Sequence, residues 1–198
     1  MDFNYKNIGI SGVAGSGKNT LAEVLGLFFS RLQLPIKELS IARNLKEEIS
    51  PACKSLYSID SLNCSREEKN LIRPMLVAHG EIKRKMTEGT HWTSLLEKDL
   101  EKDKINIITD IRYAEYPEDE YFWLTKKVNG VLIHVSRYDE IDGERHFIKP
   151  ANPSEEKNDQ RVKKLSDFSL NWRTEKNYGD MIFNSRKLLR WLKKIYVE

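Results

Sequence analysis

The fold is decided by the stretch Gly12-Val13-Ala14-Gly15-Ser16-Gly17-Lys18-Asn19-Thr20. It follows an apolar run, residues 8–10, and opens a segment whose apolar residues recur at helical spacing. A strand, a glycine-rich loop and a helix in this order are typical of a phosphate-binding P-loop. Glycines permit the backbone angles that turn successive N–H groups toward a polyphosphate, and the lysine reaches its outer phosphates. The residues expected to bind ATP are Gly12, Ala14, Gly15, Ser16, Gly17, Lys18, Asn19 and Thr20.

Length and composition set the class of protein. The chain has 198 residues, 32% of them charged, and a formal net charge of only +3. This balance excludes a surface that wraps DNA, and we expect no nucleic-acid partner. The two cysteines, Cys53 and Cys64, match no zinc or redox spacing. No leader and no membrane-length apolar run is seen, so we expect a cytoplasmic protein (in the host cytoplasm if of phage origin) without a membrane partner. A homodimer is left open.

A second signature lies in the middle of the chain. The apolar run 105–109 ends in Asp110, the arrangement of a buried strand whose terminal carboxylate lies near Mg²⁺. Arg112 follows two residues later, and in a continuing strand both side chains project to the same side. We expect Asp110 to hold Mg²⁺ through water and Arg112 to contact phosphate. The alternative is a salt-bridged pair on the surface.

Strands and helices alternate along the chain. Strands are expected at 8–10, 35–40, 105–110, 131–135 and 181–183, with amphipathic helices between them. This order predicts an α/β fold of the three-layer P-loop type. Its central sheet has five mostly parallel strands, the P-loop strand in the middle and helices on both faces. We expect a single domain over residues 1–198.

Two further regions are expected around the phosphates. Residues 138–171 lose apolar content and predict a polar lid that carries Arg145 and Arg161, with a plain surface excursion as the alternative. Arg137 emerges just beyond the preceding strand, at the edge of the sheet where ligands bind. Residues 42–90 predict the acceptor-binding region. Arg43, Lys46 and Arg73 are its candidate cations, although a solvated helix surface explains Arg43 and Lys46 equally well.

The type of reaction is narrowed by what the motifs lack. No Asn-Lys-x-Asp motif that reads guanine is present, and Ile111 stands where many ATP-driven motors carry a glutamate. A small kinase is therefore favoured, in which cations neutralise the transferred phosphoryl group. The candidates for this role are Lys18, Arg112 and Arg137, with Asp110 beside the metal. Because no convincing general base is found, an acceptor that is already a phosphate fits better than an alcohol.

These residues resemble a known family. The loop ending Gly17-Lys18-Asn19-Thr20, the element Asp110-Ile111-Arg112-Tyr113 and the run 133–137 are similar to the deoxynucleoside monophosphate kinases of tailed bacteriophages, within the nucleoside monophosphate kinase group. The resemblance implies that Lys18 binds donor phosphates and that Arg137 faces the nucleotides. It also implies that Asp110 lies near Mg²⁺, that Arg112 contacts phosphate and that the acceptor site is lined by Ala42, Leu45 and Lys46.

The chain also departs from the family pattern. Glu115-Tyr116 replaces an expected Asn and Glu, and Asn152-Pro153-Ser154-Glu155 replaces a His-x-Ser-Glu pattern. Asn19 stands where a P-loop usually carries Ser or Thr, but adenylate-kinase-like loops share the Gly-Lys-x-Thr ending. The helix with His79-Gly80 keeps the glycine without its usual polar neighbours.

The resulting hypothesis is an ATP- and Mg²⁺-dependent phosphotransferase that acts on a (deoxy)nucleoside monophosphate. Two alternatives remain. One is a small-metabolite kinase of the dephospho-coenzyme A or phosphomevalonate kinase type, and the other is a non-catalytic module that binds nucleoside triphosphates.

Overall fold

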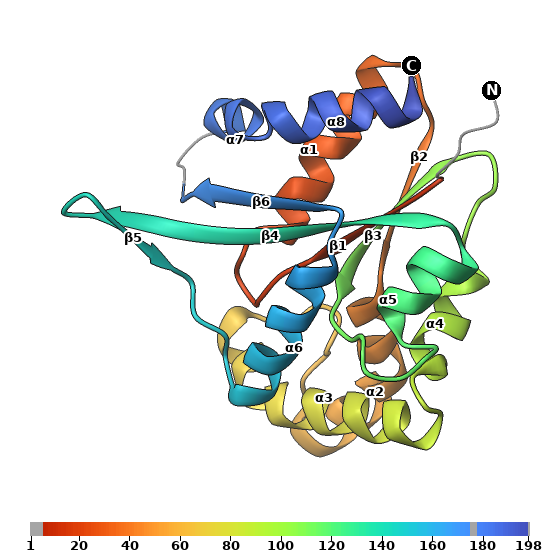
Figure 1. Cartoon of the computed structure of the whole chain (residues 1–198). Helices are drawn as coiled ribbons and strands as arrows, with labels where there is room; N and C mark the ends of the chain where they lie inside the picture. The colour runs from red at the N-terminus through yellow and green to blue at the C-terminus, as the bar shows by residue number, and fades with distance from the viewer. Residues whose placement is uncertain (1–5, 175–177, 198) are drawn as a thin grey trace.

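The computed structural model describes residues 6–174 and 178–197. Its sheet contains five parallel strands in the order β2 (Ile36–Ser40), β3 (Ile105–Ile111), β1 (Asn7–Ser11), β4 (Gly130–Ile141) and β6 (Phe168–Arg173). A sixth strand, β5 (Glu144–Phe147), pairs antiparallel with the far end of β4. The predicted α/β fold is confirmed, with the P-loop strand β1 between β3 and β4 (Figure 1). The sheet has six strands rather than the predicted five, because β5 was not expected.

Helices cover both faces of the sheet (Figure 1). On one face, α1 (Lys18–Arg31) and α8 (Arg186–Tyr196) pack their apolar residues against β1, β4 and β6. On the other face, α4 (Thr90–Glu97), α5 (Glu120–Phe122), the π-helix η1 (Trp123–Lys127) and α6 (Pro153–Leu165) build a second core. Both cores are formed by side chains that alternate along the buried strands, so the sheet is shielded from water on each side.

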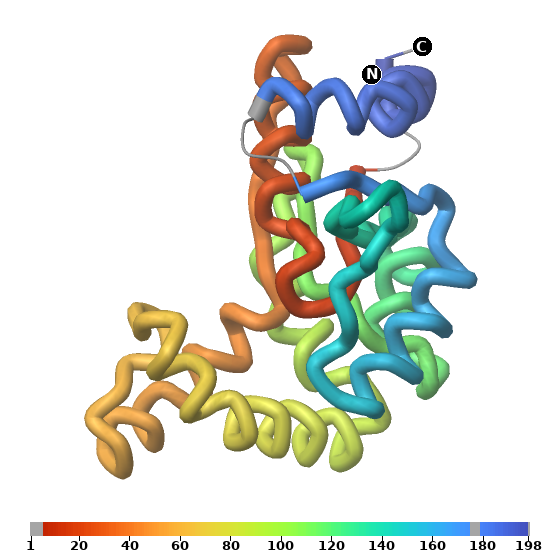
Figure 2. The backbone as a smooth tube through the Cα atoms, turned by 90° about the vertical axis from the view of Figure 1, so that its left-hand side faces the viewer, coloured from red at the N-terminus to blue at the C-terminus, as the bar shows by residue number. Residues whose placement is uncertain are grey.

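Helices α2 (Ile41–Tyr57) and α3 (Arg66–Met86) form an arm beside the carboxyl ends of the strands (Figure 2). The arm has a small core of its own, in which Ile49 and Cys53 of α2 pack against Ile72 and Leu76 of α3. Helix α3 begins at a capping box, Ser65-Arg66-Glu67-Glu68. The Ser65 hydroxyl accepts a hydrogen bond from the Glu68 N–H, while the Glu68 carboxylate accepts one from the Ser65 N–H.

The fifth parallel strand is not where the sequence pattern placed it. Residues 181–183, expected as a strand, lie in helix α7 (Tyr178–Asn184), and the strand is β6. A run of three apolar residues fits a helix as well as a strand. In β6 the residues alternate instead, because Leu170 and Trp172 are buried while Ser169, Asn171 and Arg173 are exposed.

The region 138–171 is regular structure rather than an irregular excursion. Its first part completes β4 and forms the hairpin with β5, and its second part is α6, followed by most of β6. Helix α6 is fixed on the sheet because Val162 is buried in the second core and the Asp159 carboxylate lies 3.0 Å from the His134 ring. The amino-terminal end of α6 reaches the P-loop, where Glu155 contacts Ala14.

Among the described residues, no helix is both long enough and apolar enough to span a membrane.

Candidate functional site

The P-loop joins β1 to α1 at the carboxyl edge of the sheet. Gly12 (φ 138°) lies so close to the Val135 carbonyl of β4 that a Cβ atom would collide with it. Gly17 (φ 93°) is the residue from which α1 starts, and it lies against the ring of Trp172. The Trp172 indole donates a hydrogen bond to the Ser16 carbonyl at 2.9 Å. The loop is therefore held in shape by β4 and β6, at two positions where only glycine fits.

The Lys18 side chain folds back into the loop. Its ammonium donates hydrogen bonds to the carbonyls of Gly12 (2.7 Å) and Val13 (3.0 Å) and lies 3.6 Å from the Asp110 carboxylate. Burial lowers the pKa of Lys18, and the nearby Arg112 adds to this effect while Asp110 opposes it. This places the ammonium beside the loop backbone that would hold phosphates, as the sequence predicts.

Asp110 is held in a strained position at the end of β3. The pairing of β1 with β3 skips Asp110, so that Ser11 faces Ile111, and Asp110 takes a left-handed φ of 69°. The strand does not continue regularly through Asp110, but the bulge still leaves the Asp110 and Arg112 side chains 3.8 Å apart. The Ser40 hydroxyl donates a hydrogen bond to the same carboxylate at 3.0 Å. Burial opposes ionisation of Asp110, but Lys18 and Arg112 outweigh it and keep the pKa below its usual value.

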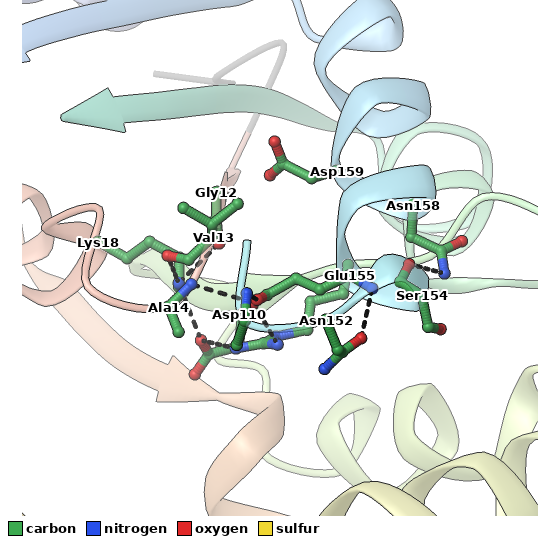
Figure 3. A network of polar contacts seen from close by, with 12 residues as sticks. Gly12, Val13, Ala14, Lys18, Asp110, Asn152, Ser154, Glu155, Asn158 and Asp159 are labelled. Carbon is green, nitrogen blue, oxygen red and sulfur yellow. Dashed lines mark hydrogen bonds and ion pairs between the residues drawn. The ribbon is translucent and has the colours of Figure 1, made fainter. Parts of the chain in front are cut away.

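Glu155 of α6 is a site residue that the sequence analysis missed (Figure 3). Its Oε1 atom accepts a hydrogen bond from the Ala14 N–H of the P-loop at 3.0 Å and lies 3.2 Å from the Arg112 guanidinium. Its Oε2 atom accepts a hydrogen bond from the Ala151 N–H at 2.7 Å. In the sequence, Glu155 was quoted only as the last residue of the stretch that replaces the His-x-Ser-Glu pattern, without a role. The helix start at Asn152 explains an acid in the first turn of α6 but not its contact with the P-loop.

The Glu155 carboxylate shows what this site can bind. It is an anion held by a P-loop N–H and a guanidinium, which are the two kinds of donor that recognise phosphate. The Ala14 N–H has one hydrogen to donate, so a phosphate oxygen that accepts it must replace the Glu155 oxygen. Glu155 therefore marks an anion position beside Lys18 and competes for it.

Arg137 belongs to β4, the strand that pairs with the P-loop strand β1. It lies opposite Trp172 in the register of β4 and β6, and Trp172 itself contacts the loop. The Arg137 Nε atom is buried and has no hydrogen-bond partner among the described residues. A buried guanidinium nitrogen without an acceptor fits the expected contact with an anionic ligand.

The candidate acceptor cations separate into two groups. Arg43 is exposed and pairs with Glu47 on the same helix, so the structure does not bring it to the site. Lys46 and Arg73 gather around Lys69, a residue that the sequence analysis did not select. Burial lowers the pKa of Lys69, and the positive charges of Lys46 and Arg73 lower it further. The charges of Lys46 and Arg73 therefore act on Lys69, and a bound anion would relieve this repulsion.

Ala42 lies half-buried in the first turn of α2, two residues after Ser40, whose hydroxyl donates a hydrogen bond to Asp110. A pocket next to Arg112 runs between α3 and α6. Its lining includes Val77, Glu81, Tyr113 and Asn158. The Oδ1 atom of Asn158 is buried there without a hydrogen-bond partner in the part of the chain that the structure describes.

Arg84, which stands between two lysines in the sequence, is buried behind the site. Its guanidinium donates two hydrogen bonds to the Asp119 carboxylate, at 2.9 and 2.8 Å, and one to Glu115 at 2.9 Å. The rings of Tyr113 and Tyr116 lie over it, with centroids 4.0 and 4.7 Å away. These contacts fix the loop that follows Arg112.

Glu120 also holds the loop that follows β3 in place. Its carboxylate accepts hydrogen bonds from the backbone N–H groups of Arg112 and Tyr113. Burial raises the pKa of Glu120 to about 8, and the neighbouring Asp119 contributes to the increase. The position of Arg112 therefore depends on a carboxyl group that is mostly protonated at neutral pH.

The two arginines predicted for the lid lie on β5 and on α6. Arg145 belongs to β5 and stacks on Tyr138, 4.8 Å from the ring centroid, within the β4–β5 hairpin. Arg161 is exposed on α6. The position expected for a lid arginine, over the loop, is taken by the α6 residue Glu155.

No group of three or more His, Cys, Asp or Glu side chains in residues 6–174 and 178–197 is arranged to hold a metal ion. The expected mode of Mg²⁺ binding does not need such a group, because phosphates and water supply most ligands and one carboxylate suffices. Asp110 fits that role because it is ionised, lies next to Lys18 and is oriented by Ser40.

Comparisons with known proteins add little. No protein-family model matches the sequence, and no curated protein matches it. Among solved structures, dephospho-CoA kinase from Campylobacter jejuni is similar, with 13% identity and a TM-score of 0.40 over 96% of this chain and 98% of that chain. A likeness at this level does not identify a reaction, so the function is inferred from the residues of this chain.

Proposed function

We propose that the chain is an ATP-dependent phosphotransferase that moves the γ-phosphoryl group to a (deoxy)nucleoside monophosphate. The observation that carries this proposal is the anion position between Ala14 and Arg112, where the Glu155 carboxylate lies. The position adjoins Lys18 and Asp110, which are the two functional side chains of a P-loop site.

On the donor side, the loop backbone and Lys18 would bind the β- and γ-phosphates of ATP. Asp110 would hold Mg²⁺ through water, and the metal would neutralise charge between these phosphates. Arg137 would approach the donor from β4, because its buried Nε atom has no acceptor among the described residues. These roles require no movement of β1, β3 or β4.

On the acceptor side, the cation cluster of Lys46, Lys69 and Arg73 supports an acceptor that carries a phosphate. Lys69 already has a lowered pKa among its neighbours, so a phosphate dianion bound there would relieve the repulsion. Arg112 lines the pocket between α3 and α6 and pairs with Glu155, which contacts the P-loop, so it would contact both phosphates. Its guanidinium matches phosphate oxygens in bidentate geometry.

The reaction then needs position and charge rather than a base. An oxygen of the acceptor phosphate attacks the γ-phosphorus, and the bond from that phosphorus to the bridging oxygen of ADP breaks. Negative charge develops on the transferred group and on ADP, next to Lys18 and Arg112. No proton has to leave an acceptor that is already a dianion.

The alternatives differ in the acceptor. A small-metabolite kinase of the phosphomevalonate type would use the same cation cluster, whereas a dephospho-coenzyme A kinase would phosphorylate a hydroxyl group. A hydroxyl acceptor would need a base, and both oxygens of Asp110 already contact Lys18, Arg112 or Ser40. A binding module without catalysis would leave the cation cluster without a function.

The test is ADP release from ATP and Mg²⁺ with each of the common ribo- and deoxyribonucleoside monophosphates in turn. We expect turnover that depends on one or a few of them and is lost in Lys18→Ala. The control Lys104→Ala removes a half-buried lysine that pairs with Glu101 at 2.6 Å, far along the chain from the loop, and should retain turnover. Turnover only with dephospho-coenzyme A or phosphomevalonate would replace the nucleotide acceptor. ATP binding without any acceptor-dependent turnover would favour the module.

A further inference from the structure

Three helices meet at the base of the α2–α3 arm. Gly80 of α3 lies against Leu45 of α2, so that a Cβ atom on Gly80 would come within 2.7 Å of the Leu45 side chain. The Trp92 indole of α4 donates a hydrogen bond to the Gly80 carbonyl at 3.3 Å. Trp92 is buried in the second core, whereas the arm has a core of its own. This junction therefore joins the arm to the helices that cover the sheet.

A cluster of four ionisable side chains lies at the same junction. The Glu48 carboxylate of α2 lies 2.7 Å from the Lys83 ammonium of α3 and 2.7 Å from the His91 ring of α4. Its Oε1 atom also lies 3.4 Å from the Nε2 atom of His79 on α3. This nitrogen is buried and makes no hydrogen bond with any residue that the structure describes. One carboxylate thus contacts side chains from both neighbouring helices.

Glu48 keeps its negative charge over the range in which histidine side chains titrate. Burial opposes its ionisation, but hydrogen bonds from Lys83 and His91 outweigh this effect and lower the pKa of Glu48 to about 2. Lysine side chains stay charged between about pH 5 and 8, whereas histidine side chains gain a charge as the pH falls through this range. The charge of this cluster therefore changes at its two imidazole rings.

Other charged groups of the helices packed at this junction make their contacts away from the two rings. They are Glu47 with Arg43 on α2, Arg84 of α3 with Asp119 and Glu115, Glu81 with Lys85 on α3, Glu97 of α4 with Lys127, and Glu120 of α5 with the backbone of Arg112 and Tyr113. The charges that face the rings are those of Glu48 and Lys83.

We propose that Glu48 is a positioning residue that holds the arm against α4, and that His79 and His91 strengthen this attachment as the pH falls. A charged imidazole donates a stronger hydrogen bond to a carboxylate than a neutral one does. Protonation of His79 adds an ion pair at 3.4 Å, where the neutral ring makes no hydrogen bond. The charge of Lys83 on the same carboxylate limits the gain, so we expect a change of about two- to fivefold in the attachment equilibrium.

The attachment matters for the proposed acceptor site, and this consequence rests on the proposed function. Lys46 lies on α2, and Lys69 and Arg73 lie on α3. The arm extends away from the sheet (Figure 2), so its attachment sets where these cations lie relative to the P-loop. A firmer attachment should therefore lower the KM for a phosphate-bearing acceptor and leave kcat almost unchanged.

The first test measures hydrogen exchange of the full chain and needs no turnover. Exchange of the α2 and α3 amides is compared at about pH 6 and about pH 8, after correction for the intrinsic pH dependence. Helix α1 serves as an internal reference for titration elsewhere in the chain, such as that of Glu120. The wild-type arm should be about two- to fivefold better protected at the lower pH.

The double variant His79→Gln, His91→Gln should lose this difference, because glutamine offers a neutral donor at either pH. Glu48→Gln should lose it as well. The matched control His146→Gln replaces an exposed histidine on β5 and should keep it. Equal protection of the wild-type arm at both pH values, or a double variant that keeps the difference, would overturn the proposal.

The second test follows the acceptor by ADP release. The KM of His91→Gln divided by that of the wild type should be about two- to fivefold at about pH 6 and close to one at about pH 8, with kcat changed less than about twofold. Ionisation of the acceptor cancels in this ratio. The same ratio at both pH values would refute the link between the junction and the acceptor. A chain that releases no ADP with any acceptor would refute the proposed phosphotransferase, while the exchange measurement still decides whether the attachment depends on pH.

Discussion

Substituting Glu155 by Gln should make the chain bind ATP more tightly. In the structure, the Glu155 carboxylate accepts the Ala14 N–H at 3.0 Å and lies 3.2 Å from Arg112. A bound phosphate takes over both donors, so part of the binding free energy is used to displace Glu155. The glutamine keeps the shape of the side chain, and its amide oxygen can still accept the Ala151 N–H.

The size of the effect follows from these two contacts. A hydrogen bond to a charged acceptor contributes about 1.5–3 kcal/mol and one to a neutral acceptor about 0.5–1.5 kcal/mol, so the Ala14 bond weakens by about 1 kcal/mol. The Arg112 side chain is 39% exposed, which limits the ion pair with Glu155 to about 1 kcal/mol or less. Together these changes predict an affinity gain of about 5- to 30-fold.

The assay is calorimetric titration of the full chain with a non-hydrolysable ATP analogue and Mg²⁺. Glu156→Gln is the matched control, because it removes the same charge from the same turn of α6 at an exposed position. We expect the control to change the affinity less than twofold. If Glu155→Gln binds the analogue no more tightly than this control, Glu155 does not occupy the phosphate position.

Three further variants test the surroundings of the site. Arg84→Met leaves the fully buried carboxylate of Asp119 without its partner and should lower the free energy of unfolding by about 3–5 kcal/mol in urea titrations; a loss below about 1 kcal/mol would contradict a supporting role. Glu120, with an ordinary pKa of 4.5 raised to about 8, binds a proton in the folded state over this range, so the free energy of unfolding should fall as pH rises from about 5 to 8, by at most about 1.4 kcal/mol per pH unit. Glu120→Gln should flatten this slope, and an unchanged slope would assign it to other groups. Arg112→Lys should lower kcat by about 10- to 100-fold in the ADP-release assay while changing the free energy of unfolding by less than about 1 kcal/mol, and normal turnover would remove Arg112 from the reaction.

Features encoded by neighbouring residues could be predicted from the sequence. The P-loop, the buried strands β1, β3 and β4, and the capping box at Ser65 each depend on a pattern within a few residues. The contact between Lys18 and Asp110 could also be predicted, since both residues lie at the ends of parallel strands that finish at the same edge of the sheet.

Features that depend on distant contacts could not be predicted. Glu155 meets Ala14 across 141 residues, and Arg84 meets Asp119 across 35. In the sequence, Glu155 is an ordinary acid in a first helical turn and Arg84 an ordinary cation between two lysines. Only the packing of the folded chain brings Glu155 to the P-loop and buries Arg84.

Strand β6 was missed for a different reason. Its alternating residues 168–173 were present in the sequence, but they lie in a long polar stretch whose composition favours a surface segment. The short apolar run 181–183 was chosen instead because it is more hydrophobic, although its spacing fits a helix equally well. The alternation was the better signal, since Trp172 holds the P-loop from this strand.

The most direct test of the central claim follows the γ-phosphoryl group itself. The wild-type chain is incubated with ATP labelled in the γ-phosphate, Mg²⁺ and a mixture of nucleoside monophosphates, and the labelled products are separated. We predict label in a nucleoside diphosphate and none in the same reaction with Lys18→Ala. Label found only in inorganic phosphate, or left in ATP, would contradict a phosphotransferase built on this P-loop.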